Sequence, residues 1–300
     1  MSHLLFSTHT NSSLANVVAR VAGMRMGRCV VSEYPNKEVY VQIHESVEGK
    51  DVFVLGSTFS PAENILQLAI MIDTLKLHGA KSVSVLIPFF AYGRSDRVDK
   101  PGVSVSGQVI ADIIQECGAT RIMTVNIHST FAEQFFIVPF INMSALPLLA
   151  DTVRRIKIRN PVIVSPDEGG VRRAREFALA LGIADVVTIS KERLDSGKVR
   201  VRTVSGEVAA RDVIIVDDIV ETGETMVCAI QKLKQMDARS IYVVAVHAGR
   251  EGGGIQKLVR AREVKKIFVT DTIPPKRPFP KKISVISVAR LFGEAVQRSD

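Results

Sequence analysis

Cysteine is scarce in this chain, which has three cysteines, Cys29, Cys117 and Cys228, and no Cys-x-x-Cys pair. So few and so widely separated cysteines argue against a disulfide framework and against a zinc site, and they fit a reducing compartment such as the cytoplasm. Tryptophan is absent, and aromatic residues make up 6% of the sequence. The chain therefore lacks the stacking aromatics that single-stranded nucleic-acid binding uses.

Long apolar runs are also missing. The longest, such as 213–216, are far shorter than the roughly 20 residues that a membrane-spanning helix needs. The first residues, MSHLLFSTHTNSS, show no positive cluster followed by an apolar stretch, so a secretory signal is not supported. We therefore expect a soluble cytoplasmic protein with no membrane partner.

Positively charged residues outnumber negatively charged ones, which gives a formal net charge of +8. Such a charge predicts an anionic partner. The lysines and arginines are scattered among acidic residues and form no basic stripe, which disfavours nucleic acid. A small phosphorylated molecule is the favoured partner.

Apolar, β-rich runs alternate along the chain with segments of helical period. Strands are expected at 51–55, 82–88, 121–127, 161–165, 186–190, 212–216, 241–247 and 266–270. Amphipathic helices are expected at 63–77, 108–117, 172–180 and 226–236. This alternation predicts an α/β fold with mostly parallel sheets, each covered by helices on both faces.

The chain length of 300 residues corresponds to about two domains. The best junction lies at 145–159, where Pro147 precedes a helix-like stretch and the turn-prone pair Asn160-Pro161 precedes a new strand. The expected domains are therefore residues 1–146 and residues 147–300.

The sequence VIIVDDIVETGET, followed by a helical run, carries the sharpest signal. It predicts a buried strand that ends in Asp217 and Asp218, at the sheet edge where parallel sheets bind ligands. Gly223 lets the backbone approach a phosphate, and Thr222 and Thr225 add hydroxyl donors at a helix N-terminus. The alternative is a plain strand, turn and helix without a ligand. The segment is neither a Walker A motif nor a dinucleotide fingerprint.

Two further strand ends carry polar groups. In SPDEGGVRRAR, Asp167 lies beside paired glycines, an arrangement that suits hydrated Mg²⁺ together with substrate phosphates. In IPFFAYGRSDRVDK, Arg94 and Arg97 follow an aromatic-rich strand end, where guanidinium groups can stack on a purine or clamp a polyphosphate. Taken alone, the first segment is as consistent with an ordinary turn as with a metal site. For the second segment taken alone, a salt-bridged surface loop is favoured over a binding site.

Two smaller sites remain. His128, in NIHST, is a lone histidine at a strand end, and most such histidines are structural. Lys191 and Arg193, in ISKERL, are close enough in sequence to act together on one phosphate, although a solvated charged turn is the ordinary reading.

In this order, these segments resemble the ribose-phosphate pyrophosphokinase family, also called phosphoribosyl pyrophosphate synthetases. The resemblance runs from YPNKE to TDTIP, nearly the whole chain, and rests on AYGRSDR, the IHS histidine, SPDEGG, the Lys-x-Arg pair and VDDIVETGET. It implies two phosphoribosyltransferase-type α/β domains, each a mostly parallel sheet flanked by helices. The N-terminal domain would hold the ATP and Mg²⁺ side, and the C-terminal domain would hold the ribose 5-phosphate loop.

The resemblance implies transfer of the diphosphate of ATP to the 1-hydroxyl of ribose 5-phosphate. The implied catalytic residues are Lys191 and Arg193, and the implied Mg²⁺ ligands are His128 and Asp167. The implied ATP-binding residues are Asn36, Lys37, Glu38, Arg94 and Ser95. The implied ribose 5-phosphate-binding residues are Arg193, Asp217, Asp218, Glu221, Thr222, Gly223, Glu224 and Thr225. The family's ATP pocket is completed by a neighbouring subunit, so a homo-oligomer, either a hexamer or a dimer-based assembly, is implied.

The chain departs from the family pattern in both pockets. Asn36 and Lys37 stand in YPNKE where relatives have F-P-D-G-E, and Ser95 stands where glutamine is frequent. Glu221 replaces an aspartate, and Glu224 replaces a small residue in the phosphate loop. Because the phosphate contacts would be mainly backbone N–H groups, Glu224 is tolerable if its side chain points outward.

Two other functions compete with the synthetase. A phosphoribosyltransferase would use the same sugar-phosphate loop but needs only one such domain, so the N-terminal segments argue against it. A non-catalytic, synthetase-like regulatory subunit is favoured by the altered nucleotide pocket and by Glu224. It is disfavoured because the chain retains Lys191, Arg193, His128, Asp167 and Asp217.

Overall fold

The computed structural model describes residues 3–193 and 199–298, and the chain divides into two compact units. Unit 1 comprises Met1–Ser144, Thr272–Pro274 and Ser287–Asp300, and unit 2 comprises Ala145–Asp271 and Pro275–Ile286. Within the described residues no helix is both long enough and apolar enough to cross a membrane.

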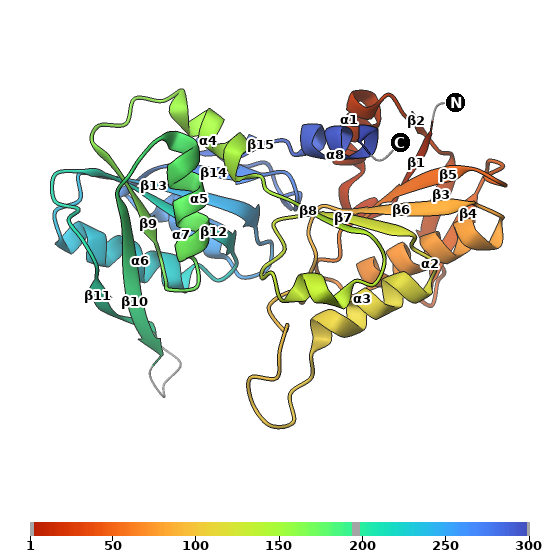
Figure 1. Ribbon diagram of the computed structural model, residues 1–300, viewed down its shortest axis with the longest axis horizontal. Coiled ribbons are helices and arrows are strands. Elements are labelled where there is room, and N and C mark those ends of the chain that lie inside the picture. Colours follow the sequence, from red (N-terminus) through yellow and green to blue (C-terminus); the bar gives the residue numbers. More distant parts are fainter. Residues whose placement is uncertain (1–2, 194–198, 299–300) are drawn as a thin grey trace. The chain divides into compact units, whose positions relative to one another are not determined.

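Unit 1 is built on a six-stranded parallel sheet of order β2-β1-β5-β6-β7-β8. Its strands are β1 (Leu4–Ser7), β2 (Arg25–Met26), β5 (Asp51–Leu55), β6 (Ser82–Ile87), β7 (Arg121–Val125) and β8 (Phe140–Met143). Helices α1 (Ser12–Ala22) and α8 (Ala289–Gln297) cover one face, and α2 (Glu63–Leu77) and α3 (Ser106–Glu116) cover the other (Figure 1). The central strands are almost wholly buried because helices shield both faces, as the continuous apolar runs predict.

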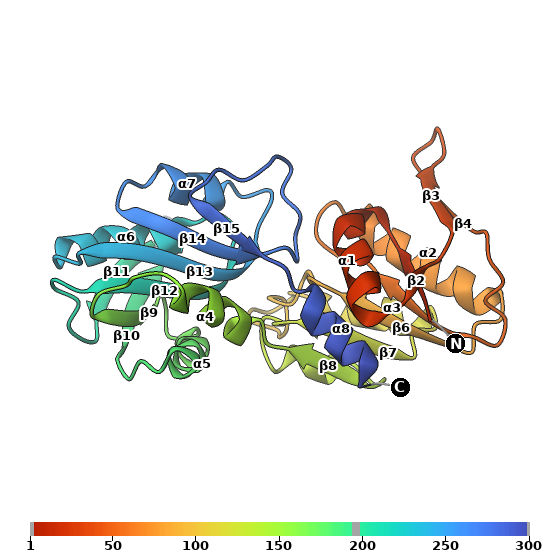
Figure 2. The same cartoon turned by 90° about the horizontal axis from the view of Figure 1, so that it is seen from above.

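An antiparallel hairpin, β3 (Cys29–Glu33) with β4 (Val39–Ile43), belongs to unit 1 but not to its main sheet. It projects from that sheet (Figure 2). The backbone of Lys37 has φ 73° at its tip, which closes the turn between the two strands.

The C-terminal helix α8 belongs to unit 1, whereas the sequence-based boundary placed residues 287–300 in the second domain. It packs on α1 so closely that a Cβ on Gly293 would lie 2.6 Å from Val21 Cγ1. Phe292 and Val296 are buried. The apolar stripe of α8 is satisfied by α1, a contact between the two ends of the chain that a linear domain boundary cannot express.

Unit 2 is built on a seven-stranded sheet of order β11-β10-β9-β12-β13-β14-β15, in which only the β10–β11 pair is antiparallel. Its strands are β9 (Pro161–Ser165), β10 (Val186–Arg193), β11 (Val199–Val204), β12 (Asp212–Val220), β13 (Ser240–Ala248), β14 (Val264–Thr270) and β15 (Ile283–Ile286). Helices α4 (Leu146–Arg154) and α5 (Val171–Leu181) lie on one face, and α6 (Glu224–Gln235) and α7 (Gly254–Arg260) lie on the other (Figure 2).

The topology of unit 2 determines where polar side chains can gather into a binding site. Strands β9, β10, β12 and β13 are parallel neighbours, so their carboxyl ends meet at one edge of the sheet. Strand β13 is buried along its whole length and β12 along nearly all of it, which makes the sheet a rigid support. Polar side chains at this edge therefore come together from segments that are far apart in sequence.

Candidate active site

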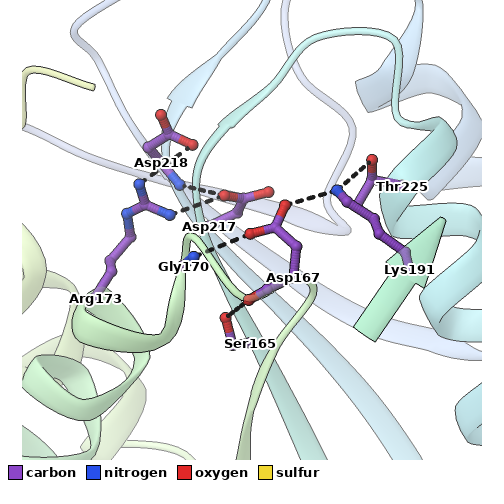
Figure 3. Close-up of polar contacts among 8 residues, drawn as sticks. All are labelled: Ser165, Asp167, Gly170, Arg173, Lys191, Asp217, Asp218 and Thr225. Atoms are coloured by element: carbon purple, nitrogen blue, oxygen red, sulfur yellow. Dashed lines mark hydrogen bonds and ion pairs between the residues drawn. The ribbon is translucent and has the colours of Figure 1, made fainter. Parts of the chain in front are cut away.

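Two carboxylates and one guanidinium group form the centre of the edge of unit 2. Asp217 and Asp218 lie within β12, and Arg173 reaches them from the first turn of α5 (Figure 3). Arg173 Nη1 donates to Asp217 Oδ1 at 3.0 Å, and Arg173 Nη2 lies 3.5 Å from Asp218 Oδ1. The three side chains are only 16%, 14% and 7% exposed for Arg173, Asp217 and Asp218.

The environment disfavours the charged form of Asp217. Burial, followed by the neighbouring charge of Asp218, raises the pKa of Asp217 well above its ordinary value, and Arg173 acts in the opposite direction. The Asp217 side chain also accepts a hydrogen bond from the Asp218 N–H at 2.8 Å. Arg173 is thus the group that favours charge on a carboxylate pair that could accept hydrogen bonds from vicinal sugar hydroxyls.

Asp167 follows β9 and lies beside Asp217 (Figure 3). Its Oδ1 accepts a hydrogen bond from the Gly170 N–H at 2.9 Å. Its Oδ2 lies 2.6 Å from Lys191 Nζ, and Lys191 also donates to Thr225 Oγ1 at 3.3 Å. Lys191 therefore joins the segment after β9 to the start of α6.

The segment 221–225, called the phosphate loop below, comprises the turn after β12 and the first two residues of α6. Gly223 is in the left-handed region, with φ 72°, directly before the first residue of α6. The side chains of Thr222 and Glu224 are exposed. Glu224 therefore points outward and stands in the first turn of α6, where a carboxylate is compatible with the helix dipole.

Arg193 ends β10, two residues after Lys191, and its backbone pairs with Val199. Its side chain lies outside the described part of the structure, so its predicted role is not located. For the same strand, Ser190 Oγ donates to Glu168 Oε1 at 2.9 Å, which ties β10 to the loop that carries Asp167.

In unit 1, the loop 91–97 lies against the His128 segment. Asp96 is buried, and its Oδ2 accepts a short hydrogen bond from Ser129 Oγ. Burial opposes the charge on Asp96, but the hydrogen bonds from Ser129 and Arg97 prevail and lower its pKa. A Cβ on Gly93 would lie 3.5 Å from His128 Cβ, so this segment approaches the histidine directly.

The side chains of Arg94 and His128 are exposed, and Ser95 is half-buried. The Ser95 carbonyl accepts a hydrogen bond from the Gly107 N–H at 3.1 Å, which fixes the loop on the start of α3. Three of the predicted site residues of unit 1, Arg94, Ser95 and His128, thus lie on two segments that contact each other.

The other predicted ATP-binding residues, Asn36, Lys37 and Glu38, lie at the tip of the β3–β4 hairpin and are exposed. Asn36 Oδ1 accepts a hydrogen bond from the Glu38 N–H at 3.2 Å, and Lys37 Nζ lies 3.3 Å from Glu33. Their contacts are local to the hairpin, so the tip presents its side chains outward.

Sequence reasoning missed two features of this site. Arg173 was one of three arginines at the start of a helix, and only the helical turn shows that it faces the carboxylates, while Arg172 and Arg175 are exposed. The second is the glycine-rich stretch GREGGG, residues 249–254, which begins two residues after the buried His247 and matches no motif. Its contacts with the phosphate loop are described below.

Oxygen donors suited to a metal are present at the edge of unit 2. Asp167 is 30% exposed and lies beside the Asp217 carboxylate. Among the described residues, no three His, Cys, Asp or Glu side chains cluster as a ready-made metal site. One or two carboxylates are a donor set that fits Mg²⁺, which takes much of its coordination from water and substrate phosphates.

A cavity of about 540 Å³ lies in unit 2 and is lined by residues 248–250 at the end of β13, by α7 and by residues 275–280. None of the predicted site residues lines it. Residues 275–278 on its rim are exposed.

The two α/β units and the phosphate loop after β12 place the chain in the class of phosphoribosyltransferase-type α/β proteins. Residues 141–272 match the phosphoribosyl transferase domain, and residues 3–118 match the N-terminal domain of ribose phosphate pyrophosphokinase. The chain is 35% identical over 291 residues to the ribose-phosphate pyrophosphokinase of Aquifex aeolicus (strain VF5), with 96% of this chain and 93% of the relative covered.

A second relative, the ribose-phosphate pyrophosphokinase of Wolinella succinogenes, is 36% identical over 295 residues, which cover 98% of this chain and 94% of the relative. The crystal structure of phosphoribosylpyrophosphate synthetase from Mycobacterium smegmatis superposes with a TM-score of 0.92 at 30% identity, covering 100% of this chain and 99% of the other. The chain belongs to the ribose-phosphate pyrophosphokinase family.

Proposed function

We propose that this protein transfers the diphosphate of ATP to the 1-hydroxyl of ribose 5-phosphate, giving phosphoribosyl pyrophosphate and AMP. The observation that carries the proposal is the junction in unit 2 where Lys191 joins Asp167 to Thr225 of the phosphate loop. That junction brings a cation, an acidic group and a phosphate cradle to one sheet edge. Family membership over nearly the whole chain supports it.

In this proposal the phosphate loop, Glu221 to Thr225, binds the 5-phosphate through its backbone N–H groups, including those of Thr222, Gly223 and Glu224. Asp217 and Asp218 accept hydrogen bonds from the ribose hydroxyls, and Arg193 assists at the phosphate. The 1-hydroxyl oxygen bonds to the β-phosphorus of ATP as the bond to the α-phosphate oxygen breaks, and the hydroxyl proton is released. Positioning and charge neutralisation supply the catalysis, and no covalent enzyme intermediate is required.

Lys191, with Arg193, faces negative charge that grows on the transferring phosphoryl oxygens. In the structure Lys191 already lies 3.3 Å from Thr225 of the phosphate loop, which supports this role. Its contact with Asp167 at 2.6 Å holds the ammonium group in place before substrates bind.

We propose Mg²⁺ as the metal, and we propose metal-ligand roles for Asp167 in unit 2 and, independently, for His128 in unit 1. When bound, the ion neutralises the phosphate oxygens of ATP and orients them. Support comes from the oxygen-rich edge of unit 2 and from the exposure of His128.

We propose that Arg94 and Ser95 bind ATP together with Asn36, Lys37 and Glu38 of a neighbouring subunit in a homo-oligomer. The outward display of the hairpin tip supports this arrangement. A cytoplasmic location is supported by the cysteines, since none of the three forms a disulfide in the described structure.

The test is incubation of the pure protein with ribose 5-phosphate, ATP and Mg²⁺ while AMP is followed. The proposal expects AMP that depends on ribose 5-phosphate. Substrate binding without AMP release would instead identify a regulatory subunit, and consumption of phosphoribosyl pyrophosphate with a nucleobase would identify a phosphoribosyltransferase.

A further inference from the structure

A second loop supports the phosphate loop in unit 2. It is the sequence GREGGG, residues 249–254, which follows β13 and is called the glycine loop here. The Gly249 N–H donates to the Val220 carbonyl at 2.9 Å, and the Gly254 N–H donates to the Glu221 carbonyl at 2.8 Å. The glycine loop thus holds the last residue of β12 and the first residue of the phosphate loop through backbone hydrogen bonds.

The two loops touch too closely for any side chain between them. A Cβ on Gly252 would lie 2.5 Å from the Glu221 carbonyl oxygen, and a Cβ on Gly254 would lie 2.4 Å from the same atom. A Cβ on Gly223 would lie 2.7 Å from Gly254 Cα. Three glycines are therefore required by contact between backbones, whereas Gly253 has no neighbour within 4 Å of a Cβ.

The side chain of Glu221 adds a third connection. Its Oε1 accepts a hydrogen bond from the Gly252 N–H at 3.1 Å. Its Oε2 would lie 2.4 Å from a Cβ on Gly249, so the carboxylate occupies the space that this glycine leaves open. Glu221 is the first residue of the phosphate loop, yet its carboxylate engages the glycine loop.

We propose that Glu221 is a positioning residue, whose carboxylate fastens the phosphate loop to the glycine loop before ribose 5-phosphate binds. A phosphate cradle made of backbone N–H groups binds well only if those groups already point at the ligand. The Glu221 contact limits the rotation of the loop at its first residue. This inference rests on the proposed function, because it assigns the order of the loop to the binding of that substrate.

The fit is reciprocal. Glu221 has the reach to accept from Gly252 only because position 249 carries no side chain, and Gly252 approaches the loop only because it too lacks a Cβ. The glycine loop is thus a determinant of ribose 5-phosphate affinity although it lies outside the proposed ligand contacts.

The experiment compares Glu221→Ala with Glu221→Gln in the full-length protein. Calorimetry with ribose 5-phosphate alone measures Kd, and steady-state assays measure KM for each substrate and kcat. Loss of a hydrogen bond to a charged acceptor corresponds to about a tenfold loss of affinity. We expect Glu221→Ala to raise Kd and KM for ribose 5-phosphate about tenfold, with KM for ATP changed by less than about twofold on the same scale.

Glu221→Gln keeps a carbonyl oxygen that can accept from Gly252, so it should restore most of the lost affinity. Hydrogen exchange of the phosphate-loop amides should be faster in Glu221→Ala than in Glu221→Gln. If the two variants bind ribose 5-phosphate equally poorly, the charge itself contacts the ligand and the positioning role is wrong. If Glu221→Ala binds as the wild type does, the role is also wrong.

Glycine substitutions give a second route that does not alter Glu221. Gly252→Ala should raise Kd for ribose 5-phosphate, whereas Gly253→Asn, which keeps the left-handed backbone that asparagine tolerates, should not. Equal effects of the two would overturn the proposal.

Failure of the proposed function is distinguishable. If the wild type binds ribose 5-phosphate but releases no AMP, the diphosphate transfer fails and the binding pattern still decides the role of Glu221. If AMP is released and Glu221→Ala keeps its affinity, only the positioning role fails. A wild type that binds no ribose 5-phosphate overturns both.

Discussion

Arg173 is the only cation that an ion pair joins to both Asp217 and Asp218 within the described residues, so its removal is the most informative perturbation of the site. Arg173→Met removes the charge and keeps an apolar stem. The two carboxylates are 14% and 7% exposed, so water compensates them poorly. Removing one partner of a buried ion pair costs about 3–5 kcal/mol. We expect the lower end, about 3 kcal/mol at pH 8, because Asp217 can take up a proton.

The pH dependence has a definite sign. Burial first, and then the charge of Asp218, raises the folded-state pKa of Asp217 above its unfolded value, and loss of Arg173 raises it further. The cost of charging Asp217 is therefore absent below the ordinary aspartate pKa of about 3.9 and grows as pH rises through the folded-state pKa. The stability deficit of Arg173→Met should shrink as pH is lowered from 8 towards 4.

Urea unfolding at pH 8, 6 and 5 measures this effect. With a slope of about 1–3 kcal/mol per molar urea, a 3 kcal/mol loss lowers the midpoint by about 1 M or more. Arg172→Met is the matched control, since Arg172 is its exposed neighbour on α5 and should change stability by less than about 0.5 kcal/mol. Equal midpoints for the two variants at pH 8, or a deficit that does not change with pH, would refute the reasoning.

Three further predictions follow from other contacts. Lys191→Ala should lower kcat by about 10² or more and change KM far less, because it removes one preorganised donor. Steady-state kinetics measure both constants, and a kcat within a few-fold of wild type would show that Lys191 has no part in the mechanism. Asp167→Asn should raise the Mg²⁺ concentration for half-maximal activity about tenfold, and an unchanged Mg²⁺ titration would argue against a metal role. A hydrogen bond from Arg25 is the largest cause that lowers the pKa of Glu45 to about 2. The charged Glu45 carboxylate therefore contributes folding stability that is fully present above the ordinary glutamate pKa and is lost as pH falls through about 2. In thermal unfolding, Glu45→Gln should be less stable than wild type at pH 7 and no different near pH 2. A Glu45→Gln deficit that persists at pH 2 would contradict this cause.

Much of the fold was predictable because parallel strands covered on both faces have continuous apolar sequences. The expected strand at 212–216, with Asp217 and Asp218 at its end, is the first part of β12, which continues through both aspartates to Val220, and 63–77 is α2. Strand ends carrying acids also predicted the sheet edge at which Asp167 and Asp217 meet. The general rule that ligands bind at the carboxyl ends of parallel strands was sufficient for this step.

What the sequence did not predict depends on contacts between distant segments. Helix α8 belongs to unit 1 because its apolar face packs against α1, and no local sequence pattern identifies α1 as its partner. Arg173 is distinguished from its neighbours only by the direction that one helical turn gives it. The glycine loop matters because its backbone meets the phosphate loop, and glycine spacing alone cannot tell a contact from a flexible turn.

Diphosphoryl transfer at the unit 2 cradle is the central claim, and ATP carrying radioactive phosphorus at its β position tests it most directly. The label should leave ATP only when ribose 5-phosphate is present, appear in a sugar product that also carries the 5-phosphate, and be absent from the AMP released. Label recovered as ADP or as free diphosphate, with none in the sugar, would contradict the account.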